Sequence, residues 1–127
     1  MTTADIDAQR DLPESESFGT LFERVTVMHS TDRWAATAND LSTVLGRPKF
    51  SDATGWATWD VLSISDESEG PAWSLLARTA DLTATVERAR SLGWDVGDVS
   101  RGGHEVRVPL RSPNGLSVIA YTPASAS

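Results

Sequence analysis

Two histidines and one aspartate are the side chains of this sequence best suited to moving a proton. His29 ends an alternating apolar stretch, in phase with Val25 and Val27. His104 opens another such stretch, and Asp60 interrupts a third. An imidazole can donate or accept a proton near neutral pH, and a carboxylate in apolar surroundings can act as a general acid or base. His29, Asp60 and His104 are therefore the candidate catalytic residues.

Each of the three also has a structural interpretation. His29 could form a hydrogen bond at the end of its strand, near the next helix cap. His104 could face solvent without touching Glu105, because neighbours on a strand point to opposite faces. Asp60 could be a charge at a bulge or a sheet edge. The sequence contains no nucleophile motif, P-loop or dinucleotide-binding glycine pattern.

Five tryptophans in 127 residues form the second chemical signal. Trp56, Trp59 and Trp73 fall on expected sheet strands, where a ring could stack on a flat ligand or hold a cation. Trp56 and Trp59 differ in parity, so only one of them should face inward unless a bulge intervenes. We expect these tryptophans, with Met28 and Arg107, to bind ligand, although packing in the core is the alternative for each.

Charge and composition narrow the class of protein. The net charge is −7, from 18 acidic and 11 basic residues, which argues against binding nucleic acid. There is no cysteine, which excludes disulfides and thiolate sites. No apolar run is long enough for a membrane span, and residues 1–17 lack the apolar core of a signal peptide. We expect a cytoplasmic protein with a disordered acidic tail over 1–17 and one domain over 18–127.

Periodicity and turn residues predict the elements that position these side chains. Helices are expected from about residue 34 to Gly46 and from about 81 to Gly93, each ended by its glycine. Ser30, Thr31 or Asp32 should cap the first helix, and Thr79 or Asp81 the second. The expected strands are 21–30, 49–51, 56–65, 72–78, 94–99, 105–110 and 116–121. The strand–helix–strands order occurs twice, in modules of about 21–65 and 72–123. In the first module either one strand is missing or Asp60 marks a tight break.

One stretch resembles a known family. A helix from Asp81, a stop at Gly93, a strand Glu105–Leu110, the turn Ser112-Pro113-Asn114-Gly115 and a strand Leu116–Tyr121 follow in order. This order resembles the second half of a vicinal oxygen chelate protein, the superfamily of glyoxalases, bleomycin-resistance proteins and extradiol dioxygenases. The resemblance implies an α+β fold in which paired βαβββ modules form a curved mixed sheet around a cavity, with helices on the outer face.

The same resemblance implies positions for metal ligands, and they carry unsuitable residues. The position on the first strand falls at Arg24, Val25 or Thr26, and its equivalent in the second module falls at Ser74. The remaining positions fall at Ser63 or Ser65 and at Ile119. His, Glu and Asp are the usual ligands of such ions. We therefore expect no metal and no other cofactor.

The sequence thus leads to a metal-independent homodimer that sequesters a small aromatic natural product or drug, as bleomycin-resistance proteins do. The first alternative is a metal-free biosynthetic isomerase, cyclase or lyase that uses His and Asp for acid–base catalysis. The second is a protein-interaction domain without a cavity. Candidate acid–base residues facing one pocket would favour the enzyme, whereas a pocket walled by Trp and acidic residues would favour the binder.

Overall fold

The computed structural model describes residues 17–67 and 70–124. The expected acidic tail lies, apart from Ser17, outside these residues. A 3₁₀ turn, η2 (Gly19–Leu21), precedes the first module, which comprises β1 (Phe22–Ser30), α2 (Trp34–Leu45), β2 (Phe50–Ser51), β3 (Trp56–Thr58) and β4 (Leu62–Ser65). The second comprises β5 (Trp73–Thr79), α3 (Leu82–Ser91), β6 (Asp95–Val96), β7 (Ser100–Arg101), β8 (Glu105–Arg111) and β9 (Ser117–Pro123). Neither described helix is long and apolar enough to cross a bilayer.

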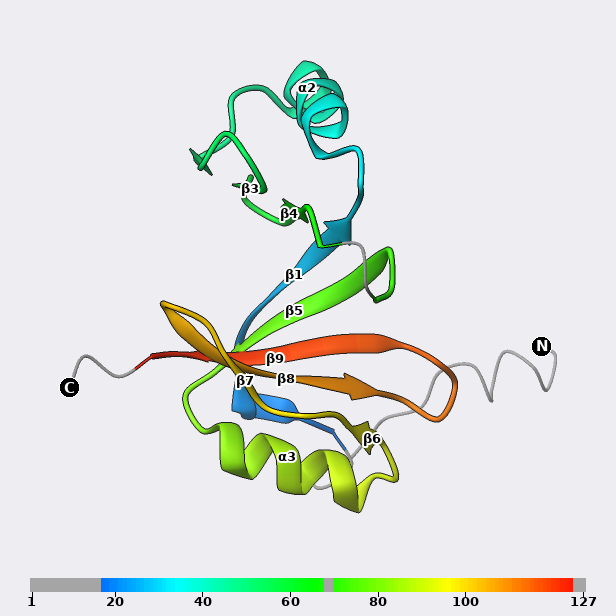
Figure 1. Ribbon diagram of the computed structural model, residues 1–127. Helices are drawn as coiled ribbons and strands as arrows, with labels where there is room; N and C mark the ends of the chain where they lie inside the picture. Colours follow the sequence, from blue (N-terminus) through cyan, green and yellow to red (C-terminus); the bar gives the residue numbers. More distant parts are fainter. Residues whose placement is uncertain (1–16, 68–69, 125–127) are drawn as a thin grey trace, which may run out of the picture.

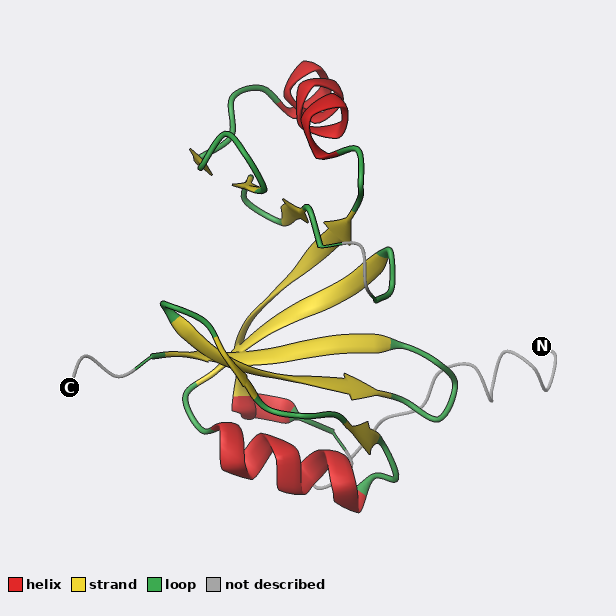
Figure 2. Ribbon diagram, in the orientation of Figure 1, coloured by secondary structure: helices red, strands yellow, loops and turns green. Residues whose placement is uncertain are grey.

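The nine strands formed by the described residues belong to one curved mixed sheet, in the order β2-β3-β4-β1-β5-β9-β8-β6, with β7 paired to β8 (Figure 1). Within each module the last strand returns parallel to the first: β4 beside β1, and β9 beside β5. The modules meet where β1 pairs antiparallel with β5. Figure 2 shows the two helices at opposite ends of the sheet. The expected α+β class and curved mixed sheet are confirmed.

The first module lacks no strand. Where one long strand was expected over 56–65, a tight turn divides β3 from β4, and the backbone N–H of Trp59 donates to the Leu62 carbonyl at 2.7 Å. Asp60 lies exposed in this turn, so its break in the apolar pattern marks a hairpin. Of the strand expected over 94–99, only β6 forms, and β7 follows beyond its expected end. Gly97 separates them, and a Cβ there would approach Pro109 Cγ to 2.5 Å.

The helix ends follow the local sequence closely, with one exception. Gly46 ends α2 with φ of 87°, a conformation that glycine adopts without strain. Asp81 caps α3 by accepting a hydrogen bond from the Ala84 N–H at 2.9 Å. The cap expected for α2 at residues 30–32 is not formed: its N-cap is Arg33, without a side-chain bond. Thr31 Oγ1 instead accepts from the Arg33 N–H, one residue before the helix.

Each helix covers a separate small core. Under α3 the core is built from alanine, valine and leucine side chains on β5, β8 and β9, and Ala89 of the helix has no exposed surface. Thr79 and Thr85 are also completely buried, and their hydroxyls are hydrogen-bonded at 3.0 Å. Under α2 the core consists of Trp34, Trp59, Ile64 and Ala57. The first module therefore depends on two large rings.

Candidate functional site

Cross-strand register assigns every strand residue to one of two faces, because paired residues point to the same side of a sheet. Ala57, Ile64 and Ala77 belong to the two cores, so the face that they share lies under the helices. We call the opposite side the concave face. Met28 pairs with both Ser63 and Ser74 and lies on the concave face, where it is 3% exposed. The site is built on this face.

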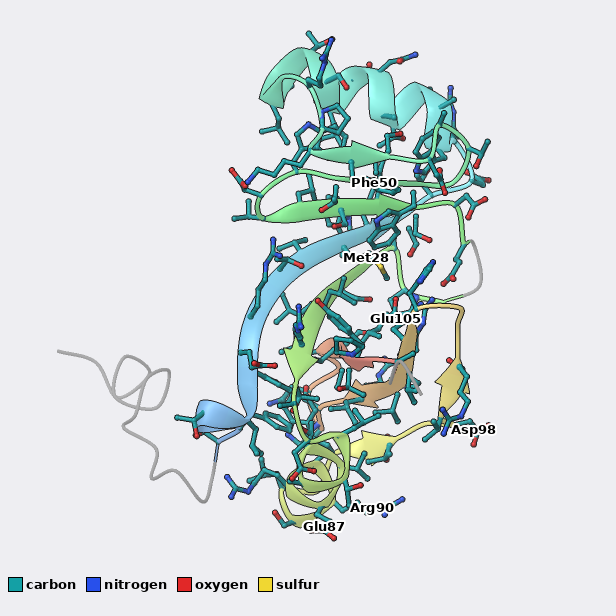
Figure 3. The ribbon with its side chains drawn as sticks, turned by 90° about the vertical axis from the view of Figure 1, so that its left-hand side faces the viewer. Met28, Phe50, Glu87, Arg90, Asp98 and Glu105 are labelled. Atoms are coloured by element: carbon teal, nitrogen blue, oxygen red, sulfur yellow. The ribbon has the colours of Figure 1, made fainter. Side chains whose placement is uncertain are left out.

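The concave face of the first module carries an aromatic wall, which we define as Phe50, Trp56 and Met28. Trp56 pairs with Ser65, and Phe50 pairs with Thr58, which places both on the concave side. Phe50 is 57% exposed, an unusual position for a large apolar ring. Figure 3 places Phe50, Met28 and Glu105 one below another, from the first module towards the second. The rings of Phe50 and Trp56 supply the flat apolar surface of this wall, whereas Met28, at 3% exposed, offers almost none.

A loop with a strongly stabilised carboxylate positions this wall. Asp52 Oδ1 accepts from the backbone N–H groups of Thr54, Gly55 and Trp56 at 2.8–2.9 Å. The backbone donors of Gly55, Thr54 and Trp56 lower the pKa of Asp52 from 3.8 to about 2. Since Trp56 itself is one of the donors, the ionised carboxylate fixes the start of β3 and therefore the direction of its ring.

The concave face of the second module carries a charged pocket of about 310 Å³. Its floor is Pro109 and Ile119, which are register partners on β8 and β9. Its charged lining consists of Glu67 from the β4–β5 loop, Asp98 and Arg101 from the β6–β7 region, and Arg107 from β8. Arg107 Nη2 lies 3.7 Å from Glu67 Oε1. This ion pair links the end of the first module to the second module. The two modules thus present different chemistry, aromatic and charged.

The positions implied for metal ligands do not suit a divalent cation. Ser63 and Ser74 face the concave side, and their hydroxyls are paired with Thr58 at 2.8 Å and with Ser117 at 3.3 Å. Ile119 offers no donor atom. Within residues 17–67 and 70–124, no three His, Cys, Asp or Glu side chains come together in a group that could hold a metal. This donor set does not fit the metal that the fold suggests.

Two of the three tryptophans that we expected to bind ligand do not lie on the concave face. Trp59 is 5% exposed in the core under α2, where its Nε1–H donates to the Gly46 carbonyl at 2.9 Å. Trp73 lies on the convex side, 59% exposed, with its ring stacked on His29 at 4.1 Å between centroids. Neither lines the concave face, contrary to expectation. Trp56 does, in agreement with the opposite parity of Trp56 and Trp59.

The candidate acid–base residues are not brought together. His29 lies on the convex side with Nδ1 2.7 Å from the Ala72 carbonyl. Asp60 is exposed in the β3–β4 turn and forms an ion pair with Lys49. His104 is exposed in the turn between β7 and β8. No pocket described above includes any of the three. Met28 and Arg107 do lie on the concave face, and Arg107 lines the pocket.

Sequence reasoning missed Phe50, Glu67, Asp98 and Arg101. Phe50 could have been found, because it is a large aromatic residue on an expected strand, but alternation does not predict its exposure, since Lys49 and Ser51 are exposed too. Glu67, Asp98 and Arg101 lie in or beside loops, and no periodic signal distinguishes them from solvated surface charges. Only the folding of the β4–β5 and β6–β7 segments over β8 and β9 brings them into one pocket.

Comparison with known proteins supports the architecture. The sequence matches no protein-family profile, and no curated protein matches it significantly. Among solved structures, one described as an NAD-dependent benzaldehyde dehydrogenase from Legionella pneumophila aligns with a TM-score of 0.68 at 10% identity, covering 80% of this chain and 100% of that chain. A glyoxalase/bleomycin resistance protein/dioxygenase superfamily member from Vibrio splendidus 12B01 aligns with a TM-score of 0.58 at 12% identity, and the alignment covers 78% of this chain and 97% of that chain. At such identities the likeness concerns the fold alone.

Proposed function

We propose that this protein binds a small aromatic molecule on the concave face of its sheet and that it does so without a metal. The observation that carries the proposal is the aromatic wall. Two rings that could have packed in the core, Phe50 and Trp56, instead face the concave side. Where the fold suggests metal ligands, the chain has paired hydroxyls and Ile119. A face with stacking surface and without metal donors is suited to holding a ligand.

Binding is favoured over catalysis by the placement of the acid–base candidates. A general acid or base must come within hydrogen-bond reach of the proton that it moves. His29, Asp60 and His104 lie on the convex side and in two separate turns, so they cannot act on one ligand in the concave site. Sequestration of an aromatic natural product or drug in the cytoplasm is therefore the function that we infer.

We also propose that the protein acts as a homodimer. The described residues expose eight large hydrophobic side chains, each at 47% or more, which is considerable for so small a chain. They are Val25, Val44, Leu45, Phe50, Val61, Trp73, Val99 and Leu116. An isologous contact that covered some of them would remove apolar surface from water.

The test is a screen of flat aromatic compounds by calorimetry, followed by Trp56→Ala and a matched control, Trp73→Ala. Loss of a ring that forms the wall should weaken binding by about 1–3 kcal/mol, from lost area and stacking. Trp73→Ala should leave the affinity within about twofold, because that ring lies on the opposite face. Equal effects of the two substitutions would refute the concave site. Elemental analysis that finds stoichiometric Mn, Fe, Ni or Zn, with binding lost on chelation, would refute metal independence.

A further inference from the structure

The charged pocket on the concave face of the second module is lined by residues of both charge signs. Arg107 on the concave face and two acidic residues, Glu67 and Asp98, line a floor of Pro109 and Ile119. Arg101 also borders the pocket, but it pairs with Val106, so its side chain lies on the helix-covered face. Its volume of about 310 Å³ lies at the small end of the range for ligand sites. The pocket is therefore large enough for the polar end of a small ligand.

These charges do not satisfy one another closely. Arg107 and Glu67 are 3.7 Å apart, with side chains 29% and 55% exposed, whereas a tight charged hydrogen bond measures about 2.7–2.9 Å. Within residues 17–67 and 70–124, neither Asp98 nor Arg101 forms an ion pair within 4.0 Å. A loose, partly exposed pair contributes little to stability. These side chains can therefore turn to a ligand at small cost.

Glu67 is nevertheless held in place by its backbone. Its N–H donates to Ser65 Oγ at 3.2 Å, at the end of β4, and Ser65 is 4% exposed. Arg107 is held by β8, in register with Tyr121 of β9. The carboxylate and the guanidinium thus approach from different modules, and a ligand that lies beside the pair can contact both charges.

We propose that this pocket binds the zwitterionic end of an amino-acid-like ligand, with its carboxylate at Arg107 and its ammonium at Glu67 and Asp98. A purely anionic ligand would meet two carboxylates, and a purely cationic ligand would meet the guanidinium of Arg107. A ligand with both charges pairs each with its opposite, which is how complementary fields give specificity. The inference rests on the proposed function, because the aromatic part of the ligand occupies the concave face.

Four probes that share one ring system separate the contributions: L-tryptophan, indole-3-propionate, tryptamine and indole. Each is titrated by calorimetry into the wild type, Arg107→Gln and Glu67→Gln. Arg111→Gln is the matched control, because Arg111 is on the same strand and face but does not line the pocket. Circular dichroism confirms that each variant is folded.

The wild type should bind L-tryptophan about tenfold or more tightly than each of the other probes, or about 1.4 kcal/mol. Arg107→Gln should abolish the preference for L-tryptophan over tryptamine. Glu67→Gln should abolish the preference for L-tryptophan over indole-3-propionate. Arg111→Gln should preserve both. If indole or indole-3-propionate binds as tightly as L-tryptophan, or if Arg107→Gln changes nothing, the zwitterion site is refuted while the aromatic site stands. If none of the four probes binds while the screen of flat aromatic compounds finds a ligand, the zwitterion site is refuted and the aromatic site stands.

Discussion

Trp59→Ala separates a core role of this ring from a role in ligand binding. Trp59 is 5% exposed and is one of four buried residues under α2. Its replacement removes most of a large ring and also the Nε1 hydrogen bond to the Gly46 carbonyl, which follows the last turn of α2. Substitutions of this type lower the free energy of unfolding by about 3–5 kcal/mol, whereas the whole free energy of unfolding of a typical domain is about 5–15 kcal/mol.

The loss should be concentrated in the first module. Its core holds only Trp34, Ala57 and Ile64 besides Trp59, with Ala38 and Leu41 packed at the margin. Few neighbours remain to close a cavity, so the cost should lie near the upper end of that range. Urea denaturation, followed by circular dichroism, should show a lower midpoint at an unchanged slope if unfolding stays two-state.

Trp73→Ala is the control for this measurement, because that ring is 59% exposed and contacts His29 on the convex side. Trp73→Ala should lower the free energy of unfolding by less than about 1 kcal/mol, as surface substitutions usually do. A loss below about 1 kcal/mol for Trp59→Ala, or equal losses for both variants, would refute the assignment of Trp59 to the core. Weaker ligand binding in a folded Trp59→Ala protein at full stability would indicate a wall after all.

Three further predictions concern stability and assembly. Because the pKa of Asp52 is lowered to about 2, its ionised form stabilises the fold above the ordinary value of 3.8, and this contribution is lost as the pH falls towards 2. Asp52→Asn should show a shallower decline of stability than the wild type between those pH values in acid titrations, and equal slopes would contradict the loop geometry. Thr85→Val should cost about 1–3 kcal/mol by chemical denaturation, since it removes a buried hydroxyl that is bonded to Thr79 and to the Asp81 carbonyl. Thr83→Val, exposed on the same helix, is its control, and equal costs would show that the buried hydroxyl is unimportant. Sedimentation equilibrium should give about twice the chain mass of 13.7 kDa, whereas a monomer at micromolar concentration would exclude the proposed dimer.

Local physical chemistry in the sequence was sufficient for both helices and for the four long strands, whereas the class of fold followed from the resemblance to a known family. Gly46 and Gly93 end their helices because each adopts a positive φ, and Asp81 caps α3 through a bond that spans three residues. Alternation predicted β1, β5, β8 and β9 to within two residues at each end. Such signals depend on neighbours in the chain, so they can be recognised before any tertiary contact is known.

Tertiary structure alone decided which face each side chain occupies and which charges meet. Alternation gave Trp56 and Trp59 opposite faces, but only the packing of α2 onto Ala57 and Ile64 shows which of those faces is the core. The Arg107–Glu67 pair joins loops and strands of different modules, and no period in the sequence relates such positions. Side-chain parity is a property of one strand, whereas a site is a property of register between strands, which long-range pairing determines.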